Sequence, residues 1–174
     1  MLCSKDNCGI IQIMILYHGS NLAVTKPELL NASHGLDFGA GFYTTTNREQ
    51  AADFAKKVVD RNDGQGSPTV TSFLFDEHQA IPALEIRQFP GPTDDWLDFV
   101  VDNRRRQYVG PAYDLKIGPV ANDNVYRTIQ LYMTGVLTRE QTIDALKVRK
   151  LYNQYVFSSV RALSLLRVLK SEVV

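Results

Sequence analysis

The chain has little cysteine, no net charge and no long apolar run. Its two cysteines, Cys3 and Cys8, are too few for a disulfide framework or a zinc site, so we expect reduced thiols in a cytoplasmic protein. The 19 basic and 19 acidic residues balance, which argues against nucleic-acid binding through bulk charge but not against a local basic patch. The apolar stretch 10–16 is far shorter than the roughly 20 residues that span a bilayer. We therefore expect neither a membrane span nor, without a basic leader segment, a secretory signal.

The length and composition fit one domain, because 174 residues of which 44% are hydrophobic can bury a substantial core. There is no internal repeat, low-complexity tract or long linker. Met14 stands near the start of the first expected strand. Residues 1–13 are therefore expected to form a poorly ordered extension, and 14–174 the single domain.

Hydrophobic periodicity and capping residues predict mixed secondary structure. The expected strands are 11–18, 42–45, 69–75, 84–88, 113–118 and 154–157, and the expected helices are 47–60, 94–105, 125–133, 139–147 and 160–169. Capping-box spacing at Thr46–Glu49 and Thr138–Gln141, the N-cap residue Thr93 and the stop at Gly135 set helix boundaries. Because strands and helices do not alternate regularly, the fold class is α+β with a largely antiparallel sheet.

Three stretches of the chain could carry chemistry, although each also has an ordinary structural interpretation. His18 ends a strand before Gly19, which would let a planar ligand approach the bare peptide, yet a lone histidine is more often structural. Tyr43 follows a glycine turn and could offer its ring to a cationic ligand, or simply begin an edge strand. The segment 152–157 has the pattern of a half-buried strand. The glycines at 39 and 41 lack the third glycine and the following helix of a dinucleotide fingerprint.

Taken together, the stretches 18–20, 38–43 and 153–156 resemble the ADP-ribosyltransferases. The similarity is to the His-Tyr-Glu branch, which includes diphtheria toxin and the poly(ADP-ribose) polymerases. The chain is also similar to a bacterial family of unknown function, number 3990, over nearly everything from Met14 onward. The segments that carry this second similarity are 16–20, 37–45, 96, 103–104, 117–123 and 154–157. The resemblance implies a split, mainly antiparallel sheet flanked by helices.

The resemblance also assigns roles in an NAD site. It implies that His18 hydrogen-bonds the adenine-side ribose, that the Gly19 backbone holds the nicotinamide carboxamide, and that Tyr43 stacks on the nicotinamide ring. The pocket it implies is formed by His18, Gly19, Ser20, Gly41, Tyr43 and Thr44, with no metal ion.

The catalytic set implied by the resemblance is His18, Tyr43 and Gln154. Gln154 stands where this branch has its catalytic glutamate. Its amide can hold a ribose hydroxyl but supplies no charge, a loss worth on the order of 10²–10³ in rate. Processive polymer synthesis is therefore not expected, whereas transfer of a single ADP-ribose is.

Three further residues are additional candidates. Asp123 could cap a helix or supply the missing carboxylate, and Asn122 lies beside it. Arg104, within the run 103–106, could bind phosphate or an acidic partner, or belong to a solvated helix end.

The expected function is that of a mono-ADP-ribosyltransferase, which cleaves NAD and modifies a protein or nucleic acid. By family analogy it would be a bacterial toxin of a toxin–antitoxin or phage-defence system, with an antitoxin protein as partner. Two alternatives stay open: a non-catalytic module that binds NAD or ADP-ribose, and an NAD glycohydrolase that uses water as the nucleophile.

Overall fold

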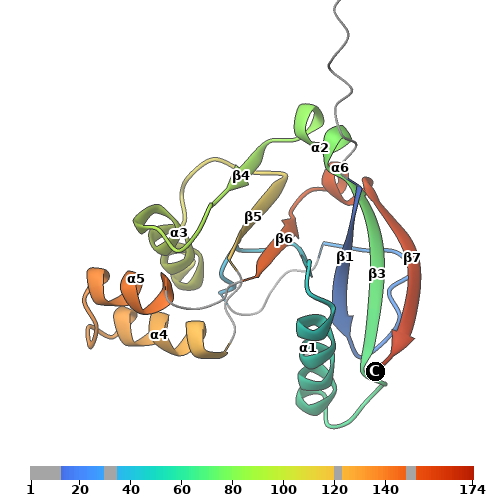
Figure 1. Cartoon of the computed structure of the whole chain (residues 1–174), viewed down its shortest axis with the longest axis horizontal. Helices are drawn as coiled ribbons and strands as arrows, with labels where there is room; N and C mark the ends of the chain where they lie inside the picture. Colours follow the sequence, from blue (N-terminus) through green and yellow to red (C-terminus); the bar gives the residue numbers. More distant parts are fainter. Residues whose placement is uncertain (1–12, 30–34, 120–122, 148–151) are drawn as a thin grey trace, which may run out of the picture.

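The computed structural model describes residues 13–29, 35–119, 123–147 and 152–174, and in them a seven-stranded sheet is flanked by six helices (Figure 1). The strands are β1 (Ile13–Ser20), β2 (Phe42–Thr45), β3 (Thr69–Asp76), β4 (Ile86–Gln88), β5 (Leu115–Pro119), β6 (Asn153–Phe157) and β7 (Leu166–Val173). The helices are α1 (Arg48–Arg61), α2 (Glu77–Ala83), α3 (Asp94–Arg105), α4 (Asp123–Met133), α5 (Arg139–Lys147) and α6 (Val160–Leu163).

The sheet order is β4-β5-β6-β2-β1-β3-β7. Only β4 and β5 pair in parallel, and every other neighbouring pair is antiparallel. The predicted α+β class with a largely antiparallel sheet is therefore confirmed. The order also shows that strands far apart in the chain, such as β2 and β6, lie side by side.

Two large apolar clusters cover opposite faces of the sheet. Phe157 belongs to a cluster with Phe42 and Phe73, whereas its neighbour Val156 belongs to a cluster with Trp96 and Ile129. Successive residues of a strand point to opposite faces, which separates the two clusters. Figure 1 shows α3, α4 and α5 grouped together at one end of the sheet and α1 beside β1 and β3.

Capping residues mark the helix ends, mostly as the sequence predicts. Thr93 Oγ1 accepts a hydrogen bond from Trp96 N at 3.3 Å at the start of α3. Thr138 and Gln141 exchange the two hydrogen bonds of a capping box, at 3.0 and 3.2 Å, before α5. The prediction for α1 is wrong by one residue, because the Asn47 side chain accepts from Gln50 N and the helix begins at Arg48.

The predicted C-terminal helix over 160–169 is wrong. Helix α6 ends at Leu163, and the chain then forms β7, which pairs antiparallel with β3. The outer edge of β3 offers unpaired peptide groups, and β7 satisfies them while Leu166 enters the core. The sequence also missed α2, which Asp76 caps, and it ended the first strand at His18, whereas β1 continues to Ser20.

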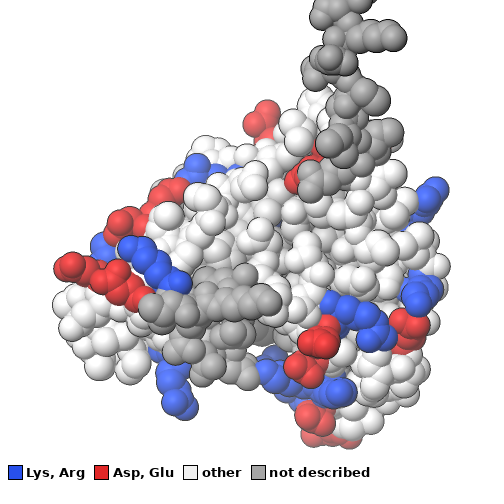
Figure 2. Space-filling model, in the orientation of Figure 1, with Lys and Arg blue, Asp and Glu red and all other residues white. Residues whose placement is uncertain are grey.

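Within the described residues, no helix has the length and apolarity needed to cross a bilayer. On the face shown in Figure 2, basic and acidic side chains lie close together along the margins of the described surface. Neither sign dominates this face.

Candidate functional site

The sheet splits between β1 and β2. β1 pairs with β3 along all eight of its residues, and β2 pairs with β6 along all four. Between β1 and β2, by contrast, the register of the described residues holds a single pair, Tyr17 with Thr45. Continuing that register would place Gly19 opposite Tyr43, but the two strands no longer pair there. The peptide edges of 18–20 and 42–44 therefore face each other across a split.

His18 bridges this split. Its Nδ1 lies 2.7 Å from the Tyr43 carbonyl oxygen, and because a carbonyl only accepts, Nδ1 carries the proton. The imidazole stacks on the Phe42 ring, with centroids 4.3 Å apart. Burial lowers the pKa of His18, although the hydrogen bond to Tyr43 opposes the shift. The ring is therefore neutral near pH 7, with Nε2 as its unprotonated nitrogen.

The Tyr43 ring is held by the loop that precedes β2. Its hydroxyl donates to Gly39 O at 2.6 Å and accepts from Phe38 N at 3.2 Å. Burial raises the pKa of Tyr43 well above its ordinary value, so the phenol stays protonated. The ring packs against the cluster that contains Val156, its cross-strand neighbour on β6.

Gln154 lies on the same face as Tyr43, because it pairs with Thr45 across β2 and β6. Gln154 is 4% exposed, and its Nε2 has no hydrogen-bond acceptor among the described residues. A buried polar group left unpaired costs about 1–3 kcal/mol, so such a group needs an explanation. A ligand that accepts this hydrogen bond would remove the cost.

The register thus brings some predicted site residues together and separates others. Tyr43 and Gln154 share one face of the sheet, toward which a side chain at position 19 would also point. Strand alternation sends the His18 ring to the opposite face, where it touches Tyr43 only through the main chain. Thr44 lies on that opposite face too, and its hydroxyl donates to Tyr155 O at 3.0 Å within the sheet.

Other residues that were predicted for the site have structural roles. A Cβ on Gly19 would lie 2.0 Å from Ala51 O, so α1 can approach β1 only over a glycine. Gly41 is enclosed by β6 in the same way, with Phe157 O at 2.8 Å from a Cβ. The half-buried Ser20 hydroxyl lies 3.4 Å from Asn21 Oδ1.

Asn122 lies outside the described residues, as does the side chain of Asp123. The backbone of Asp123 forms the first residue of α4, so Asp123 stands inside the helix and not before it. β5 ends at Pro119, opposite Asn153.

Arg104 is not part of a solvated helix end. Its side chain is 5% exposed, and Nε donates to Asp37 Oδ1 at 2.5 Å. Sequence reasoning missed Lys116, whose Nζ donates to Phe38 O at 2.7 Å and whose pKa burial lowers to about 8. The available signal in the sequence was a lysine between the apolar residues Leu115 and Ile117. This pattern suggests a half-buried lysine but does not identify its hydrogen-bond partner.

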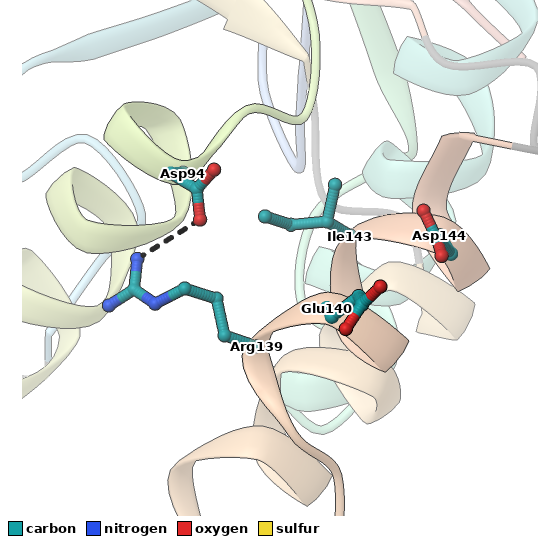
Figure 3. A pocket seen from close by; sticks show the side chains of 5 residues that line it. All are labelled: Asp94, Arg139, Glu140, Ile143 and Asp144. Atoms are coloured by element: carbon teal, nitrogen blue, oxygen red, sulfur yellow. Dashed lines mark ion pairs between the residues drawn. The ribbon is translucent and has the colours of Figure 1, made fainter.

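A separate hollow lies between the first turns of α3 and α5 (Figure 3). Its lining residues are Asp94, Arg139, Glu140, Ile143 and Asp144. Arg139 pairs with Asp94 at 3.5 Å, and this hollow shares no residue with the split. Within the described chain, no group of three or more metal-ligating side chains could hold a metal ion.

The fold and the split define an α+β protein whose mixed sheet opens between two central strands. The chain belongs to the protein family of unknown function DUF3990, whose model matches residues 14–168. No curated protein and no solved structure matches the chain.

Proposed function

We propose that the protein is a mono-ADP-ribosyltransferase whose NAD site lies at the split between β1 and β2. The observation that carries this proposal is the buried Gln154 Nε2, which has no hydrogen-bond partner among the described residues and lies on the same face as Tyr43, next to Thr45 where β1 and β2 last pair. The similarity to the ADP-ribosyltransferases over the same three stretches supports it.

In this proposal the nicotinamide lies between the peptide edge of Gly19 and the ring of Tyr43. Loss of pairing beyond Tyr17–Thr45 leaves that edge able to bond a carboxamide in place of a neighbouring strand. The two hydrogen bonds that fix the Tyr43 hydroxyl preorganise its ring for stacking. His18, whose ring lies on the opposite face, contributes by fixing the Tyr43 main chain across the split through Nδ1.

The reaction breaks the bond between C1′ of the ribose and the nicotinamide nitrogen. The bonding electrons leave with nicotinamide, positive charge develops on the ribose, and an acceptor oxygen or nitrogen bonds to C1′ and loses its proton. Gln154 would hold a ribose hydroxyl and orient the sugar. Because an amide brings no charge to the developing cation, we expect slow transfer of single ADP-ribose units.

Incubation of the protein with labelled NAD and cell lysate tests the reaction. Label attached to protein or nucleic acid supports transfer, whereas release of free ADP-ribose indicates hydrolysis. Tyr43→Ala should abolish labelling, while Tyr43→Phe, which keeps the ring, should retain much of it. His18→Ala should also lose activity, and the exposed His78→Ala should not. If Tyr43→Ala and His18→Ala both label like the parent, the site is misplaced.

Gln154→Glu gives the sharpest test of the site. A carboxylate at this position would stabilise the developing charge, so we expect NAD cleavage to rise by roughly 10- to 100-fold. Burial raises the pKa of a carboxyl group, so the gain should grow as pH increases through neutrality. The control Gln79→Glu adds the same charge at an exposed position and should leave the rate unchanged. A lower rate in Gln154→Glu would contradict a site that lacks only charge.

A binding module without catalysis is the second candidate, and the neutral amide of Gln154 is the observation that favours it. NAD would then raise the melting temperature and be recovered intact. Tyr43→Ala should remove that stabilisation in either case, so only the fate of NAD separates the two functions.

A further inference from the structure

Arg104, near the end of α3, has a buried guanidinium that its neighbours satisfy only in part. Nε pairs with Asp37, but both terminal nitrogens, Nη1 and Nη2, are buried without a hydrogen-bond acceptor among the described residues. The next residue, Arg105, is exposed. Donors on a buried cation are costly to leave unpaired, because the group has lost its water without a replacement.

The contacts around Arg104 do not remove this cost. The Tyr126 ring lies over the guanidinium, with Cζ 4.5 Å from the ring centroid. Such stacking occupies the flat face of the group, whereas its N–H bonds point outward in the plane. The Asp37 contact uses the Nε edge, which leaves the two-nitrogen fork that carboxylates and phosphates bind.

The local charge also favours an anion. Arg104 and Lys116 both bind the segment Asp37–Gly39, which carries a single acidic side chain, Asp37. The same segment holds the Tyr43 hydroxyl through Phe38 N and Gly39 O. A ligand that stacks on Tyr43 therefore lies against the loop that the two cations fix.

We propose that the terminal nitrogens of Arg104 bind a phosphate group of a dinucleotide ligand of the NAD type. This assignment rests on the proposed NAD site. Tyr126, which is 53% exposed, stacks on the flat face of the guanidinium, and the phosphate meets the terminal N–H groups in its plane. A phosphate accepts both terminal N–H groups side by side and neutralises the excess positive charge.

Calorimetry with ADP-ribose, inorganic pyrophosphate, inorganic phosphate and nicotinamide tests the proposal. Arg104→Gln should weaken binding of ADP-ribose and pyrophosphate by about 10- to 100-fold and leave nicotinamide binding unchanged. Arg105→Gln removes the same charge one residue further along an exposed surface, and should change each Kd by less than about twofold. Arg104→Lys keeps a cation beside Asp37 if Arg104→Gln does not fold, and should show a similar loss because it lacks the fork.

Three results would overturn the assignment. Unchanged ADP-ribose affinity in a folded Arg104 variant would show that the fork does not bind the ligand. An equal loss in Arg105→Gln would show a bulk charge effect. Arg104-dependent binding of inorganic phosphate as tight as that of ADP-ribose would assign the fork to a free anion.

Different results would refute the phosphate site at Arg104 and the transferase function. Arg104-dependent binding of ADP-ribose without any NAD cleavage would keep the phosphate site and remove the transferase. NAD cleavage at unchanged KM in Arg104→Gln would keep the transferase and remove the phosphate site.

Discussion

Three buried side chains carry nitrogens that the described residues leave without hydrogen-bond partners: Trp96, Arg104 and Gln154. Trp96 is fully buried in an apolar cluster, where packing of its large ring compensates for one unpaired donor. Arg104 is already held by Asp37 and by the Tyr126 ring, so only its terminal nitrogens lack partners among the described residues. Gln154 Nε2 lacks one too, and replacing Gln154 with an apolar residue of similar size would remove that cost.

His18 should make stability depend on pH. Because burial lowers its pKa below the ordinary 6.5, the unfolded chain takes up a proton that the folded protein resists. The free energy of unfolding therefore falls as pH drops below about 6.5 and is unaffected by His18 above it. Thermal unfolding between about pH 7.5 and pH 5 should show a smaller loss of melting temperature in His18→Gln than in the parent.

The exposed Gln79 provides the control for this measurement, because its replacement changes no titratable group. Gln79→Asn should follow the parent over the same pH range. Identical slopes for His18→Gln and the parent would show that the bridge between β1 and β2 does not depend on a neutral imidazole.

Among the elements, the contact between α1 and β1 is the tightest constraint near the candidate site. Gly19→Ala would place its Cβ 2.0 Å from Ala51 O and 2.9 Å from Ala55 N, both backbone atoms of α1. The helix must shift as a unit, so we expect a loss of about 2–3 kcal/mol in the free energy of unfolding. Urea denaturation measures this loss. A midpoint equal to that of the parent would mean that α1 can move freely.

Gly91→Ala is the control for that experiment, because a Cβ there meets no atom within 4 Å. Its stability should stay within about 0.5 kcal/mol of the parent. The difference between the two variants isolates the packing of α1 from the general effect of replacing glycine.

For the whole molecule, β7 closes one edge of the sheet. A chain that ends at Leu165 would leave the outer edge of β3 unpaired and expose the Phe73 and Phe75 region of the core. We expect it to lose cooperative unfolding and to aggregate, as circular dichroism and size-exclusion chromatography would reveal. Lys170→Ala, at an exposed position of β7, should behave like the parent. A soluble, cooperatively folded truncated chain would contradict this role of β7.

Local sequence signals were enough to predict much of the fold. Thr93 and the Thr138–Gln141 pair form the helix caps that their spacing predicts, because a capping box needs only residues three apart. The strands at 42–45 and 154–157 follow from β-propensity over a few residues, and together these elements specify the α+β class.

Features that depend on contacts between distant parts of the chain could be seen only in the tertiary structure. The segment after Leu163 has a sequence compatible with a helix, but the open edge of β3, about 90 positions earlier in the chain, makes it a strand. The sequence left Arg104 as either an anion-binding side chain or part of a solvated helix end, and the structure excludes the second because Asp37 and Tyr126 enclose the guanidinium. The sequence by itself determined most of the local elements and proposed the residues of the candidate site. Only the tertiary structure decided which of those residues share a face, because cross-strand register joins residues that no local pattern connects.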